Sequence, residues 1–230
     1  MTTPSADTLA NDPEYRSAIV DLLALLAMGE LLAFERLAGD AALAPQIEDS
    51  VALARLAAAE FRHFEDLTRR IEELGADPTQ AMLEFRRPLD EFHAHTAPSD
   101  WLEGMVKAYV GEGIASDFYR EIASLLDEQT RALVLRVCDD FEHQEFIVDR
   151  VRLAIQEDPQ IAGRLALWGR RLVGEALAQS QRFAAEHDSM SVLIVGGVDR
   201  PGADLAEIGR MLARLTENHA RRMAALGLAA

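Results

Sequence analysis

The sequence is poor in cysteine and in positive charge. A single cysteine, Cys138, stands among 230 residues, which excludes an internal disulfide and is typical of a protein in a reducing cytosol. We therefore expect a cytoplasmic protein. Lysine and arginine number 23 against 39 aspartates and glutamates, for a net charge of −16. This balance argues against broad non-specific binding to nucleic acid or to anionic membranes.

Long hydrophobic runs are also scarce. The longest uninterrupted candidate, Leu22 to Ala27, is far shorter than the roughly 20 apolar residues that span a bilayer. We expect no membrane partner on this ground. The first residues contain no basic region followed by an apolar block, so residues 1–12 are expected to form a flexible tail and not a secretory signal. The remaining chain is long enough for one helical domain with a real core.

Proline and glycine fall between long segments in which apolar residues recur every three or four positions. This pattern predicts an all-α protein whose helices end near the breakers. We expect a single domain over 13–230, with a four-helix core bundle over about 13–157 and two additional C-terminal helices over about 159–227. The expected core helices begin at Pro13, after Pro45, near Ser99 and after Asp127, with a loop from Ala76 to Pro98 that holds a short helix around Leu83.

Six ionisable residues occur on the apolar stripes of the four expected core helices. They are Glu30, Glu60, His63, Glu112, Asp140 and His143. Steps of three and four keep residues on one helix face, so these side chains are expected to point where the leucines point. Burying a carboxylate without a partner is costly, and a divalent cation is a partner that several acids can share.

The spacing of these six residues repeats. A Glu in the first helix is followed 30 positions later by an acid-x-x-His pair, and a second Glu is followed 28 positions later by another such pair. Ferritin-like bundles build a di-metal site from one Glu on each of two helices and Glu-x-x-His on each of the other two. By this logic Glu60 and Asp140 are terminal ligands, His63 and His143 are nitrogen ligands, and Glu30 and Glu112 are bridges. Asp140 stands where the pattern has Glu, so its side chain is shorter by one methylene group.

The segments AAAEFRHFEDL and DFEHQEF, with the helix that holds Glu112, resemble the ferritin-like di-iron carboxylate superfamily. More narrowly, they resemble the tRNA 2-methylthio-isopentenyladenosine hydroxylase group and its actinobacterial relatives. The resemblance implies two iron ions, with manganese or a mixed pair as alternatives, and O₂-dependent hydroxylation of an unactivated carbon. It also implies an external electron donor. The acidic charge disfavours tRNA as a partner, and no aromatic-basic interleaving suited to RNA stacking is visible.

Three functions remain open. The first is a di-iron oxidase or hydroxylase acting on a small organic group or modified nucleoside. The second is a ferroxidase or metal-binding protein without an organic substrate, and the third is a metal-free structural bundle. A homodimer through the outer helices is expected, whereas a cage-forming ferritin would assemble into a shell.

Several neighbouring residues are interpreted more conservatively. Glu35, Asp117 and Glu175 are candidates for ligands or for acids that orient ligands. The glycines beside the predicted ligands suggest close packing or room for a small substrate, and Cys138 is interpreted as a small buried residue. Tyr109 and Tyr119 flank Glu112 on its stripe, while His93 and His95 fall in the expected loop without ligand spacing.

Overall fold

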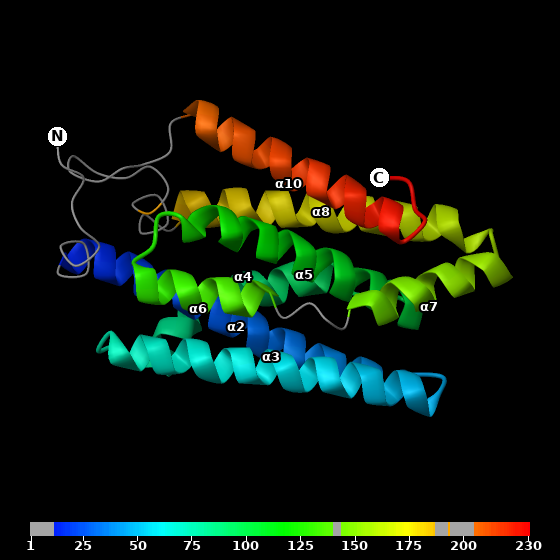
Figure 1. Ribbon diagram of the computed structural model, residues 1–230, viewed down its shortest axis with the longest axis horizontal. Helices are drawn as coiled ribbons and strands as arrows, with labels where there is room; N and C mark the ends of the chain where they lie inside the picture. Colours follow the sequence, from blue (N-terminus) through cyan, green and yellow to red (C-terminus); the bar gives the residue numbers. More distant parts are fainter. Residues whose placement is uncertain (1–11, 140–143, 187–192, 194–204) are drawn as a thin grey trace.

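The computed structural model describes residues 12–139, 144–186, 193 and 205–230, and within them it is an all-helical bundle (Figure 1). Helices α2 (Pro13–Leu43) and α3 (Ile47–Glu73) form an antiparallel hairpin along one side of the molecule. Helix α5 (Trp101–Ala123) lies in the middle with α6 (Glu128–Asp139) and α7 (Gln144–Glu157). Helices α8 (Ile161–Glu186) and α10 (Leu205–Ala225) form the opposite side. The prediction of a bundle with additional C-terminal helices is confirmed.

The ends of the first helices follow from local sequence. Asp12 caps α2 by accepting hydrogen bonds from the backbone N–H groups of Glu14 and Tyr15, with Pro13 in the first turn. Proline suits this position because its missing N–H would have no partner inside the helix. Helix α3 ends at Gly75, which adopts a φ of 84°. The N–H of Gly75 donates to the carbonyl of Glu72, and the N–H of Ala76 donates to that of Ile71, which is the Schellman arrangement.

The predicted loop from Ala76 to Pro98 is wrong. Most of it forms α4 (Pro78–His95), capped by Asp77 and packed on α2 through the buried side chains of Met82 and Phe85. Pro88 lies inside this helix, where it removes one backbone donor. The sequence interpretation gave too much weight to the prolines and too little to the burial of one apolar face.

The expected fourth core helix is described in two parts. Helices α6 and α7 cover both ends of the expected span, and residues 140–143 between them lie outside the described residues. Asp140 and His143 are among these four residues, so their assignment stays a prediction.

Helix α2 is more apolar than the sequence interpretation allowed. By length and composition it could cross a membrane, but 61 % of its most apolar stretch is buried within the fold. Helix α2 is apolar on nearly every face because α3, α4 and α5 pack against different sides of it. This feature is weak evidence for a membrane span, and a soluble bundle accounts for it.

Candidate metal centre

The apolar core is divided into two clusters along the length of the bundle. On α2 one cluster extends to Leu32 and the other begins at Leu37; on α3 the division falls between Ala57 and Leu67. On α5 it falls between Val110 and Ile122. Glu30 lies beside this division, and Glu60, His63 and Glu112 lie inside it. The four described members of the predicted ligand set therefore occupy one polar layer between two apolar layers.

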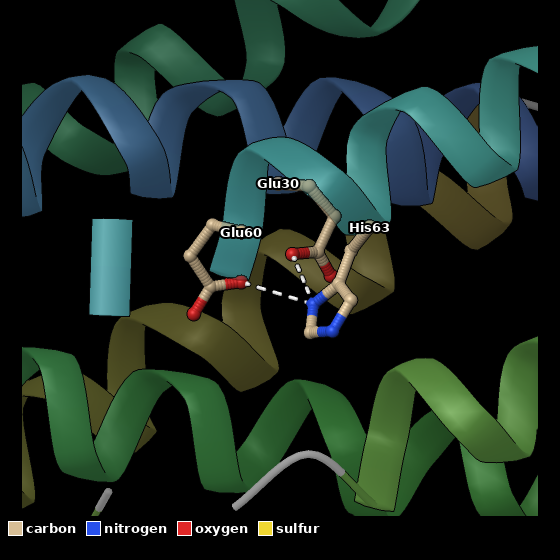
Figure 2. A group of neighbouring side chains, drawn as sticks. All are labelled: Glu30, Glu60 and His63. Atoms are coloured by element: carbon tan, nitrogen blue, oxygen red, sulfur yellow. Dashed lines mark ion pairs between the residues drawn. The ribbon is translucent and has the colours of Figure 1, made fainter. Parts of the chain in front are cut away.

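Three of the predicted ligands converge in this polar layer. Glu30 from α2 and Glu60 and His63 from α3 each offer a ligand atom within 4.8 Å of the others. The Nδ1 atom of His63 lies 3.5 Å from Oε2 of Glu30 and 3.6 Å from Oε2 of Glu60. Figure 2 shows both carboxylates directed toward this ring nitrogen. The glutamates are only 8 % and 9 % exposed, so the group is largely shielded from water.

Burial and mutual repulsion hold these acids toward their neutral forms. Burial raises the pKa of Glu30 well above its ordinary value, and the hydrogen bond and charge of Glu60 raise it further. Burial, followed by the charge of Glu60, raises the pKa of Glu112 to about 8. Glu112 on α5 thus lies within electrostatic reach of the α2–α3 group. Close carboxylates favour protonation because two like charges in a site of low polarity repel each other.

The donor set fits a divalent metal. Carboxylate oxygens and an imidazole nitrogen are ligands for iron, manganese and zinc. A dication would neutralise the repulsion that raises the pKa of Glu30 and Glu112, and imidazole would supply a neutral nitrogen. Among the described residues, the charge of Arg120 takes over part of the role of a dication. It lowers the pKa of Glu112 but does not prevent the rise caused by burial. The geometry is therefore that of a candidate metal-binding group, with the identity and number of ions open.

Arg120 is a residue near the site that the stripe pattern missed. Its guanidinium donates to the carbonyl oxygen of Cys138 and to Oδ1 of Asp139 at 2.9 Å. It therefore stands at the end of α6, directly before residues 140–143. The signal in the sequence was its position directly after Tyr119, eight residues beyond Glu112.

Tyr119 and Cys138 also lie close to the acidic layer. Burial raises the pKa of Tyr119, and the nearby charges of Glu30 and Glu112 add to the effect. Burial raises the pKa of Cys138 to about 11, so its thiol stays protonated at neutral pH. Burial also raises the pKa of Tyr109, the other tyrosine on the stripe, while the charges of Arg222 and Arg152 partly offset the rise.

The remaining candidate acids are engaged elsewhere or exposed. Asp117 forms an ion pair with Arg222 of α10 at 2.6 Å. Glu175 on α8 lies 3.6 Å from Nδ1 of His95 on α4. Glu35 is exposed.

The family follows from a comparison with known proteins. Residues 13–197 match the model of a ferritin-like domain found in actinomycetes. The chain belongs to this ferritin-like family. No curated protein matches the sequence. Ferritin-like bundles carry their metal ligands on facing helices in the bundle core, which is where Glu30, Glu60 and His63 converge.

Proposed function

We propose that this ferritin-like protein is a non-haem di-iron oxidase or hydroxylase that uses O₂ to oxidise a small organic group. The observation that supports the proposal is the polar layer of Glu30, Glu60 and His63 between two apolar clusters. A purely structural bundle gains nothing from gathering acids in its core, because their desolvation costs free energy.

Each described residue has a defined part in this proposal. Glu30, Glu60 and His63 would hold metal, and Glu112 would join them from α5 with Asp140 and His143 completing the set. When bound, a pair of iron ions supplies the redox chemistry that activates O₂. The apolar clusters on both sides exclude water and protect a reactive oxidant from side reactions. Tyr119, kept protonated by burial, can donate a hydrogen bond within the layer.

A hydroxylation by O₂ balances in electrons only if an electron donor takes part. One oxygen atom enters a C–H bond, and the other leaves as water with two electrons and two protons from outside the site. The sequence shows no flavin or nicotinamide fingerprint, so we assign these electrons to a separate reductase. A modified nucleoside of tRNA is the substrate that the tRNA hydroxylase resemblance suggests, but the net charge of −16 disfavours it.

Anaerobic loading with Fe(II) and elemental analysis test the metal centre. We expect close to two ions per chain in the wild type and well below two in His63→Ala and Glu60→Ala. His95→Ala is the matched control, because His95 is largely exposed and lies beside Glu175. Unchanged metal content in both site variants would refute the assignment.

Oxygen uptake and assembly size then separate the candidate functions. A hydroxylase takes up O₂ with a reductant present and transfers oxygen to an added organic substrate. A ferroxidase oxidises added Fe(II) without an organic substrate, and size-exclusion chromatography would reveal a many-subunit shell if it is a storage protein. Iron turnover in such a shell, with no organic oxidation, would replace the proposed function by iron handling.

A further inference from the structure

An exposed apolar stripe runs along the outer face of α3. Its members are separated by steps of four, three, four and three residues, so they lie on one side of the helix. They are Ile47, Val51, Ala54, Ala58 and Phe61. Ile47 is 71 % exposed, Val51 45 % and Phe61 37 %, and both alanines are exposed as well. We call these five residues the α3 stripe.

Exposed apolar side chains elsewhere in the described chain are scattered. The other large ones lie singly on α2, α4, α7 and α10, and ten positions apart on α8. Single exposed leucines are ordinary on a soluble protein, whereas a contiguous apolar surface marks a contact site. In Figure 1, α3 forms one edge of the molecule, and no other described helix lies beyond it in this view. The α3 stripe is therefore left open to solvent by the described residues.

One flank of the α3 stripe is aromatic. The ring centroid of Phe61 lies 5.1 Å from that of Phe34 on α2 and 5.5 Å from that of Phe64 on α3. Such ring contacts are favourable beyond the area that they bury, so they hold the exposed ring of Phe61 in place. A side chain that is already held loses little entropy when a partner covers it, and aromatic residues carry much of the binding energy at interfaces. Phe61 is therefore suited to anchor a contact.

The other flank of the α3 stripe carries charges of both signs. Glu48, Arg55 and Arg62 each directly follow a member of the stripe and recur every seven residues, so they line one side of it. All three are exposed, and none forms a hydrogen bond or an ion pair with another described residue. Arg69, the next residue in this series, lies beyond the end of the stripe and pairs with Asp66 at 2.7 Å. Along this flank, the charges without a partner therefore coincide with the stripe.

We propose that the α3 stripe binds a second copy of this chain, with the two α3 helices antiparallel about a two-fold axis at Ala54. Packed helices cross at an angle, so they are closest at the crossing point and diverge on both sides of it. The small side chain of Ala54 allows the close approach at the centre. Ile47 at one end meets Phe61 of the partner subunit, and these large side chains fill the wider space. The inference does not depend on the proposed function, because the stripe is exposed whereas Glu60 on the same helix is buried.

The charges beside the stripe favour the antiparallel pairing. It brings Glu48 beside Arg62 of the partner subunit, and the two-fold axis produces this opposite-charge pair twice. Only Arg55, near the axis, then lies beside its own copy. A parallel pairing would set all three charges against their own copies, and like charges across an interface disfavour an alignment. The sequence of the flank is therefore complementary to itself in one direction only.

Sedimentation velocity of the full-length protein over a dilution series tests the proposal. We expect a dimer of twice the chain mass of 25.3 kDa, which dissociates reversibly on dilution. Ala54→Glu should weaken dimerisation by more than about a hundredfold, because it sets two carboxylates against each other at the centre of the interface. The protomer should still fold, since Ala54 is exposed. Leu167→Glu is the matched control, because Leu167 on α8 is 64 % exposed and lies outside the stripe.

Charge reversal tests the antiparallel register. Glu48→Arg and Arg62→Glu should each weaken the dimer on the order of tenfold, because the two-fold axis makes each change act twice. The double variant should dimerise like the wild type, and a double variant as weak as the single ones would overturn the register. A monomeric wild type would overturn the proposal and leave the stripe to a different protein. A dimer that persists in Ala54→Glu but dissociates in Leu167→Glu would overturn it in favour of an interface through the outer helices.

Discussion

Two groups of ionisable side chains with opposite charge lie on the same two helices. Glu30 on α2 and Glu112 on α5 belong to the acidic layer, and the basic residues Arg36 and Lys107 lie on the same two helices one to two turns away. Burial raises the pKa of Glu112 to about 8 and lowers the pKa of Lys107 to about 7. In both groups, burial opposes the charged form and like charges nearby oppose it further.

Ion pairs elsewhere in the bundle show the contrast. Asp117 pairs with Arg222 and Asp49 with Arg150, both at 2.6 Å and each linking two helices. These pairs hold the helices in place with one charge against the other. A group of charges of one sign instead opposes folding. Such a group is the arrangement expected of a binding site. We infer that the acidic layer suits cations.

The largest expected effect is stabilisation by metal. A ligand that binds only the folded state stabilises it by about 2.7 kcal/mol at a hundred times its dissociation constant. For a chain of this length, that corresponds to a rise in Tm on the order of 5–10 °C. Thermal unfolding of metal-free protein with and without Mn(II) measures it.

The rise in Tm should disappear in Glu60→Ala and persist in Lys107→Met. A metal-induced shift of equal size in both variants would mean that the ion binds outside the acidic layer.

The next effect is a dependence of stability on pH set by Glu112. The folded metal-free protein retains a proton on Glu112 up to about pH 8, while the unfolded chain loses it near the ordinary value of 4.5. The contribution of Glu112 is therefore complete below about pH 4.5 and is lost as the pH rises toward about 8. Glu112→Gln should remove this loss and be more stable than the wild type near pH 8 by about 1–2 kcal/mol. Urea unfolding at both ends of this range tests it, and equal slopes for the two proteins would contradict it.

Lys107 should give the opposite dependence. Its pKa is lowered from 10.5 to about 7, so the unfolded chain binds a proton that the folded protein has released. Stability should rise with pH between about 7 and 10.5, and Lys107→Met should remove the rise, an effect of about 1 kcal/mol. If the wild type and the variant change in parallel over this range, Lys107 is not held in an unfavourable environment.

The fold was largely predictable because its signals are local. Apolar residues at helical spacing, with Asp12–Pro13 at a start and Gly75 at an end, predicted α2 and α3 within a few residues. Helix α4 was predicted only as a short helix around Leu83 within a loop, because the benefit of burying Phe85 depends on tertiary contacts. The apolar character of α2 likewise reflects its packing against α3, α4 and α5, which the sequence alone does not state.

The candidate site was predictable only where spacing fixes geometry. An acid and a histidine three positions apart lie on one face, so Glu60 and His63 had to be neighbours, and the structure brings Glu30 to them. Asp140 and His143 lie outside the described residues and stay predictions. The contact between Arg36 and His93 and the burial of Lys107 were not predictable, because these residues come from three helices and share no spacing. Lys107 is the only lysine in the sequence, but this does not show that it is buried.

The smallest expected effect concerns the space beside Gly111 on α5. Gly111→Ala adds a methyl group where no described atom lies within 4 Å, so the fold should gain up to about 1 kcal/mol from better helix propensity. In Gly113→Ala the methyl group would collide with the Arg222 side chain that pairs with Asp117, and stability should fall. Urea unfolding compares the two variants. Equal free energies of unfolding for Gly111→Ala and Gly113→Ala would contradict the difference in packing at these two positions.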